Sequence, residues 1–156
     1  MAEHTIQIRH GDCIEVLRSM PSGSIGHMVS DPPYDLVSGS GGFMGKAWDA
    51  TGIAFSSDLW DEVYRTLRPG GVVKAFCGTR TYHRMTAAMR KAGFVNFSID
   101  AWTYGSGFPK SLNIGKKLLQ SVGEGGVTAE EAQLWDGWGT ALKPAWEPVV
   151  ICYKPL

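Results

Sequence analysis

Several features of membrane and exported proteins are missing from this sequence of 156 residues. No apolar run reaches the roughly 18 residues that a membrane-spanning helix needs. The opening Met1-Ala2-Glu3-His4 lacks the basic and then apolar pattern of a signal peptide. We therefore expect a cytoplasmic protein.

Metal-ligand patterns and an excess of charge are missing too. The three cysteines, at 13, 77 and 152, and the four histidines show no metal-ligand spacing, so we expect no metal and predict buried free thiols. Fifteen basic and fifteen acidic residues cancel. The field of the whole molecule therefore does not favour a nucleic-acid ligand, although local basic clusters remain.

What is present is typical of one globular domain over residues 1–156, with 44% hydrophobic and 19% charged residues. Helical and strand patterns alternate, which predicts an α/β fold with a mostly parallel sheet and helices on both faces. The segment 123–133 is polar and glycine-rich, and we expect a mobile loop there. The predicted strands are 5–9, 25–29, 72–77, 94–104 and 149–153, and the predicted helices are 13–20, 57–67, 81–92 and 114–122.

The chain is organised around Asp31-Pro32-Pro33-Tyr34, which directly follows the predicted strand 25–29. Two prolines cannot continue a strand, so the carboxylate of Asp31 lies at its carboxyl end. In open parallel sheets, ligands bind at that position.

These residue types suit a planar heterocycle with an exocyclic amino group. Asp31 and the carbonyl of Pro32 would accept the two amino hydrogens, and Tyr34 would stack on the ring, a contact worth about 1–3 kcal/mol. The structural alternative is an ordinary turn that ends a strand and exposes an Asp.

The Asp-Pro-Pro-Tyr segment resembles the signature of the amino-methylating DNA methyltransferases, of the N6-adenine and N4-cytosine type. The resemblance covers essentially the whole chain and is closest to phage and bacterial adenine methylases, the phage type above all, through residues 42–49 and 138–144. The motifs that carry it are Gly11-Asp12, Asp31-Pro32-Pro33-Tyr34, Leu67-Arg68-Pro69-Gly70-Gly71, Phe108-Pro109-Lys110-Ser111 and Lys143-Pro144-Ala145-Trp146-Glu147-Pro148.

The resemblance implies a Rossmann-like, three-layer methyltransferase fold in reduced form. It also implies transfer of a methyl group from S-adenosylmethionine to N6 of adenine in DNA, after base flipping, in a bacterial or phage-infected cell. The alternative targets are N4 of cytosine and the side-chain amide of a protein glutamine, although cytosine enzymes more often have Ser, and glutamine enzymes usually Asn, where Asp31 stands. The implied site residues are Asp31, Pro32, Pro33 and Tyr34 for catalysis, Asp12, Cys13, Asp31, Phe76 and Gly78 for the cofactor, and Lys46, Arg80, Lys110 and Lys143 for DNA.

Two expectations remain open at this stage. Asp12 is either a cofactor residue or a helix N-cap, a role that Asp fills well. The resemblance also implies a segment with Gly-Ser-Gly that follows a strand, opens a helix and holds the methionine end of the cofactor. The sequence given has Gly-Ser-Gly at 39–41 and 105–107, but neither stretch both follows a predicted strand and opens a predicted helix. We therefore expect either a homodimer or second chain that completes the cofactor site, or a remnant that acts as a DNA- or base-binding module.

Overall fold

A computed structural model describes residues 5–35, 50–105, 111–122, 126–140 and 145–156. Its internal contacts divide the chain into two compact units, one formed by Met1–Trp102 with Glu147–Leu156 and the other by Thr103–Trp146. The single domain over residues 1–156 stays a prediction, and each unit is described by itself. Within the described ranges, every helix is too short or too polar to cross a membrane.

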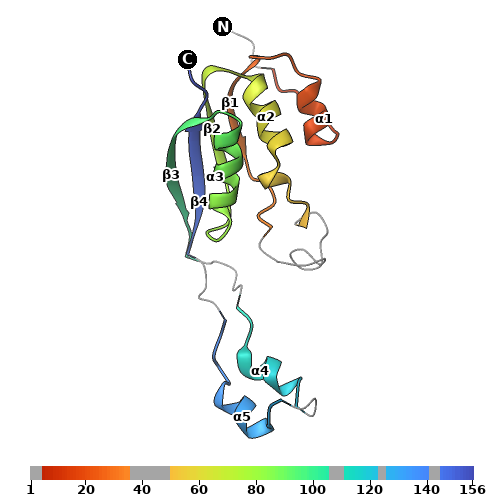
Figure 1. The fold of residues 1–156 in the computed structure, drawn as a ribbon, viewed down its shortest axis with the longest axis vertical. Helices are drawn as coiled ribbons and strands as arrows, with labels where there is room; N and C mark the ends of the chain where they lie inside the picture. The colour runs from red at the N-terminus through yellow and green to blue at the C-terminus, as the bar shows by residue number, and fades with distance from the viewer. Residues whose placement is uncertain (1–4, 36–49, 106–110, 123–125, 141–144) are drawn as a thin grey trace. The chain divides into compact units, whose positions relative to one another are not determined.

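The first unit is a four-stranded sheet with the strand order β1-β2-β4-β3 (Figure 1). Strands β1 and β2 are parallel, whereas β2 and β4 are antiparallel. The predicted α/β fold is confirmed, but the sheet is mixed because β4 runs against β2. The elements are α1 (Cys13–Arg18), β1 (Ile25–Ser30), η3 (Ile53–Phe55), α2 (Ser57–Thr66), β2 (Leu67–Phe76), α3 (Tyr82–Lys91), β3 (Val95–Thr103) and β4 (Trp146–Tyr153).

Helices α2 and α3 pack on one face of this sheet (Figure 1). The apolar side chains of α2 recur at helical spacing and become buried together with alternate residues of β2 and β4. Val29 and Lys74, which pair across β1 and β2 on the other face, are exposed. Within the described residues of the first unit, no helix covers this other face, so a second helical layer is not found there. The core contains Leu59, Trp60, Val63, Val73, Ala75, Met85, Met89, Val150 and Cys152.

A glycine lets β1 and β2 come together after α2. A Cβ atom at Gly71 would lie 2.8 Å from the carbonyl oxygen of Arg68 and 2.9 Å from that of Gly26. Real Cβ atoms do not approach backbone oxygens so closely, so any other residue would push the strands apart. Gly71 thus permits the close approach of β1 and β2.

Two predictions in this unit are wrong. Residues 5–9 form no strand, and Ile6 and Ile8 are 89% and 93% exposed. Their alternation supplies an apolar face, but a strand also needs a neighbour for its backbone hydrogen bonds, and this segment does not pair with β1. Cys13 is exposed at the start of α1, whereas the predicted burial of Cys77 and Cys152 is confirmed.

The second unit contains α4 (Ile114–Leu119) and α5 (Ala129–Leu134). The prediction of a mobile loop over 123–133 is wrong from residue 129 onward, where α5 begins. Thr128 caps α5 and Glu131 bonds back to the Thr128 amide, which is the Ser/Thr-x-x-Glu capping box. Gly115 is needed at its position, because a Cβ there would lie 2.8 Å from the backbone of Asp136.

Candidate active site

The carboxyl ends of β1 and β2 and the start of β4 lie together at one edge of the sheet in the first unit. Ser30 pairs with Ala75, so the parallel strands β1 and β2 finish side by side. Strand β4 is antiparallel to β2 and therefore begins where β2 ends, and the Cys77 amide donates to the Pro148 carbonyl at 3.0 Å. Asp31 follows β1 and Glu147 lies at the start of β4, so both carboxylates belong to this edge.

Tyr34 is held at both ends. Its hydroxyl donates a hydrogen bond to Oε2 of Glu147 at 3.2 Å, and its backbone carbonyl accepts one from Oγ1 of Thr81 at 2.9 Å. The ring is half-buried, next to a buried Pro32 and an exposed Asp31. The stiff Pro-Pro step fixes the chain between the carboxylate and the ring.

The surroundings of Tyr34 keep its hydroxyl protonated. Burial raises the pKa of this phenol far above its ordinary value, and the neighbouring carboxylates of Asp31 and Glu147 raise it further because they disfavour a third negative charge. The hydroxyl therefore acts as a hydrogen-bond donor, and a role as a base is excluded at ordinary pH.

The thiol of the nearby Cys77 does not have the lowered pKa of a catalytic cysteine nucleophile. Burial raises the pKa of its thiol to about 12, and the negative charge of Glu147 adds to the effect. The neutral thiol donates to the Pro148 carbonyl at 3.4 Å. Cysteine nucleophiles need a lowered pKa, so this thiol belongs to the structure of the edge.

Asp35 carries an acceptor without a donor. Its backbone is in the left-handed region, with φ of 49°, and Oδ1 accepts from the Gly52 amide at 3.0 Å. The other oxygen, Oδ2, is buried, and nothing in the described chain donates to it. A buried carboxylate oxygen without a partner is costly, so this position suits a ligand that brings an N–H or O–H group.

The predicted cofactor residues near the start of the chain have local roles. Oδ1 of Asp12 accepts from the amides of Ile14 and Glu15 at 3.0 and 3.1 Å, so the N-cap alternative is confirmed. Cys13 is exposed as the first residue of α1. A cofactor contact for these two residues stays a prediction.

The other two predicted cofactor residues lie at or beside the carboxyl end of β2. Phe76 is half-buried and packs edge-to-face on Trp102, with 6.1 Å between ring centroids. Gly78 is buried, and its carbonyl accepts from the amides of Thr81 and Tyr82, each at 3.0 Å, where α3 begins. Phe76 and Gly78 thus flank Cys77, whose amide bonds the carbonyl of Pro148, the residue after Glu147.

Of the predicted DNA contacts, the structure describes Arg80. It is exposed in the turn between β2 and α3, at the same edge as Asp31. Lys46, Lys110 and Lys143 lie outside the described residues.

Sequence reasoning missed Glu147 and Thr81. Glu147 stands in the Trp-Glu-Pro part of a quoted motif, but its place depends on the antiparallel direction of β4. The sequence predicts Thr81 only as the first residue of the helix 81–92. The available signal was the presence of a carboxylate directly before a predicted strand.

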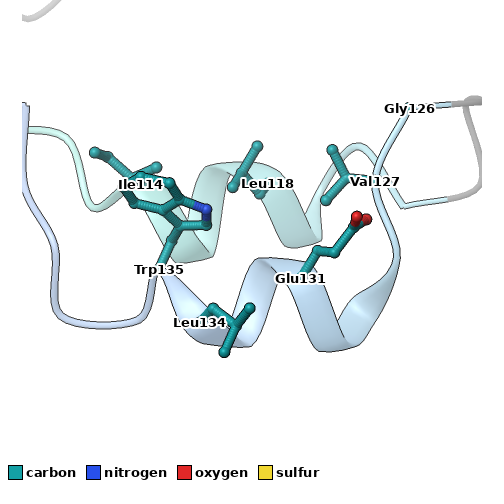
Figure 2. Close-up of a pocket in the computed structure, with 7 residues that line it drawn as sticks. All are labelled: Ile114, Leu118, Gly126, Val127, Glu131, Leu134 and Trp135. Atoms are coloured by element: carbon teal, nitrogen blue, oxygen red, sulfur yellow. The ribbon is translucent and has the colours of Figure 1, made fainter.

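The second unit holds a pocket of another kind, with a volume of about 640 Å³ (Figure 2). Its walls are mainly apolar, and Glu131, which also lines it, uses its carboxylate for the capping box with Thr128. Such a pocket suits an apolar group, and it contains none of the predicted site residues. The apolar lining consists of Ile114, Leu118, Gly126, Val127, Leu134 and Trp135.

No protein-family model matches the chain. In sequence, the chain is similar to "Putative methylase YubD" of Escherichia coli (strain K12). The two are 32% identical over 89 residues, which make up 54% of this chain and 37% of that protein.

In structure, the chain is similar to DNA methyltransferases. The match to a "Putative DNA Modification Methylase" from Thermus thermophilus, complexed with S-adenosyl-L-methionine, covers 94% of this chain and 52% of that one, with a TM-score of 0.56 and 23% identity. For M1.HpyAVI complexed with S-adenosyl-L-methionine, the coverage is 97% and 56%, the TM-score 0.52 and the identity 18%. For the cytosine-N4-specific PvuII DNA methyltransferase, the coverage is 93% and 49%, the TM-score 0.56 and the identity 17%.

The chain spans about half the length of these solved structures. The identities are too low to carry more than the fold. The described chain therefore has, in reduced form, the Rossmann-like fold of methyltransferases.

Proposed function

We propose that this chain carries the catalytic site of a DNA amino-methyltransferase that uses S-adenosylmethionine, with N6 of adenine as the target. The observation that supports this most is the Asp31-Pro32-Pro33-Tyr34 segment at the carboxyl end of β1, with Tyr34 bonded to Glu147 and Thr81. The fold shared with DNA methyltransferases supports the same proposal.

The residues present fit the cofactor. S-adenosylmethionine is a cation at its sulfonium and carries amino and hydroxyl donors, and when bound it supplies an electrophilic methyl group. Asp31 and Glu147 give the edge negative charge, and the buried Oδ2 of Asp35 needs a donor. We propose that Asp31, Phe76 and Gly78 hold the cofactor at this edge, with Asp12 and Cys13 at the start of α1.

In the proposed mechanism, this chain positions an amine that is a poor nucleophile. The lone pair of the amine is delocalised into the ring until Asp31 and the Pro32 carbonyl accept its two hydrogens and turn it toward the methyl group. The rate enhancement then comes from positioning and local electrostatics. A strong base is unnecessary, because the methylated ammonium product is acidic and loses its proton readily.

The base must leave the double helix to reach this edge. Flipping costs a few kcal/mol, which stacking on the fixed ring of Tyr34 partly offsets. We propose that Arg80, together with Lys46, Lys110 and Lys143, contacts the phosphates of the DNA.

Two further parts of the proposal concern the target and the assembly. N4 of cytosine is the second candidate target, favoured by the similar fold of the cytosine-N4-specific PvuII enzyme. We also propose that a second copy or a second chain completes the cofactor site. Without such completion, the chain would act as a module that binds DNA or a flipped base.

Transfer of a labelled methyl group to DNA tests the proposal, followed by separation of N6-methyladenine from N4-methylcytosine. Replacing Asp31 by Ala should abolish transfer without unfolding the chain, because Asp31 is exposed and outside the core. Asp100→Asn removes another exposed carboxylate, on β3, and serves as the control. Wild-type turnover by the Asp31 variant would contradict the assignment.

A further inference from the structure

Glu147 faces the proposed catalytic segment from β4, a strand far from it in sequence. The hydroxyl of Tyr34 lies near two carboxylates, Asp31 and Glu147, and donates to Oε2 of Glu147 at 3.2 Å. A phenol has one proton to donate. Asp31 and Glu147 therefore compete for this proton, and the carboxylate that accepts it is the weaker acceptor for any other donor.

It matters which carboxylate accepts the phenol proton, because in the proposed mechanism Asp31 also accepts a hydrogen of the target amine. An oxygen of Asp31 that accepts from Tyr34 is a weaker acceptor for the target amine, since the phenol neutralises part of its charge. Glu147 competes for the same phenol proton and relieves Asp31 of it.

Three features hold Glu147 and Tyr34 in place for this competition. It is half-buried in β4, which pairs with β2. The next residue, Pro148, accepts from both the amide and the thiol of Cys77. The carbonyl of Tyr34 is tied to Thr81. Hydroxyl and carboxylate are therefore both fixed by neighbours that do not touch the target.

We propose that Glu147 is a positioning residue that takes the hydroxyl proton of Tyr34 and thereby keeps the carboxylate of Asp31 available for the target amine. The proposal rests on the methyl-transfer function proposed above. It gives the Trp-Glu-Pro segment a role in the reaction through Tyr34, without contact between Glu147 and the substrate.

The test compares Glu147→Gln, Tyr34→Phe and the double variant in single-turnover methyl transfer, with excess protein and saturating S-adenosylmethionine. A neutral Gln competes less well for the proton, so the phenol turns to Asp31. We expect the transfer rate to fall about tenfold, the factor for 1.4 kcal/mol, one charge-assisted hydrogen bond. Removing the hydroxyl removes the competition, so the double variant should regain the rate of Tyr34→Phe.

This rescue is the decisive outcome, because a purely structural role for Glu147 would make the double variant worse than either single one. A second measurement does not depend on turnover. In ¹³C NMR of labelled tyrosine at neutral pH, with Tyr34→Phe for assignment, Glu147→Gln should shift the Cζ resonance of Tyr34, because its hydroxyl changes acceptor. Glu130→Gln, on the exposed face of α5, is the matched control and should change neither readout.

The outcomes separate the two proposals. Methyl transfer by the wild type without rescue in the double variant overturns the role of Glu147 and leaves the proposed function standing. Absence of transfer by the wild type, even at protein concentrations at which sedimentation shows self-association, together with no binding of DNA, overturns the function. Where transfer is absent, an unchanged Cζ resonance of Tyr34 in Glu147→Gln overturns the role of Glu147, because the bond between the two residues then does not form.

Discussion

Asp12 has two carboxylate oxygens, and its helix uses one of them. Oδ1 accepts both capping bonds, from Ile14 and Glu15, and within the described ranges nothing donates to Oδ2. A single exposed side chain can therefore cap α1 and still offer an acceptor to a ligand. The geometry is compatible with both roles that the sequence left open.

Replacing Asp12 by Ala separates these roles. The loss of the cap should lower the free energy of unfolding by about 1 kcal/mol, which chemical denaturation measures. If Oδ2 also accepts from the cofactor, calorimetry should show weaker binding of S-adenosylmethionine by about 1.5–3 kcal/mol. Asp12→Asn, which keeps a capping oxygen, is the control for stability. Lower stability with unchanged binding would remove Asp12 from the cofactor site.

At the scale of elements, Arg65 joins the end of α1 to α2. Its guanidinium donates to the carbonyls of Leu17 and Met20 at 2.8 and 2.9 Å, and it bonds Glu62 within α2. These carbonyls belong to the last turn of α1 and the residues after it, where a helix leaves acceptors without partners. Arg65 thus fixes the helix that carries Asp12.

Arg65→Met should destabilise the unit by about 1.5–3 kcal/mol, because it removes charge-assisted hydrogen bonds and keeps the apolar stem. Hydrogen exchange should show the loss first in the amides of α1. Arg18→Met is the control, because the Arg18–Glu15 ion pair is largely exposed and worth at most about 1 kcal/mol. Equal effects of the two substitutions would show that Arg65 does not hold α1.

The elements show why part of the fold was predictable. The helices around Trp60 and Met85 carry strong apolar periodicity, and the two prolines after β1 locate Asp31 without any tertiary information. Those signals are local. The missing pairing of residues 5–9 and the direction of β4 depend on which strands become neighbours, which is a property of the whole sheet. Glu147 was missed for the same reason, since its bond to Tyr34 spans 113 positions in the sequence.

At the scale of the whole molecule, the given chain has about half the length of the solved structures that share its fold. Within the first unit, helices cover one face of the sheet, and Val29 and Trp102 on its opposite face are 71% and 59% exposed. Isolated apolar side chains on a surface are ordinary. Here, however, they lie on the face of the sheet that the helices of the first unit do not cover. The exposed apolar side chains on this face suit a contact with the second copy or chain proposed above.

The last prediction concerns the affinity of these 156 residues for S-adenosylmethionine. The acidic edge around Asp31 and Asp35 suits the sulfonium and the donors of the cofactor. Within the described residues, no Gly-Ser-Gly segment follows a strand and opens a helix to hold the amino-acid end of the cofactor. We expect a dissociation constant of about 100 µM or weaker, equivalent to about −5.5 kcal/mol, in calorimetry. S-adenosylhomocysteine and 5′-methylthioadenosine are both neutral thioethers and differ in the amino-acid end, so they should bind within a few fold of each other.

This comparison tests the physical reason as well as the number. If the amino-acid end finds no partner, its removal costs little affinity, whereas a working cradle of backbone amides would make the truncated ligand far weaker. Sedimentation should accompany the titration, because self-association that completes the site would strengthen binding as the protein concentration rises. Low-micromolar binding that is independent of protein concentration, together with a large loss for 5′-methylthioadenosine relative to S-adenosylhomocysteine, would show that a glycine-rich loop of this chain, at 38–42 or 105–107, already holds the amino-acid end.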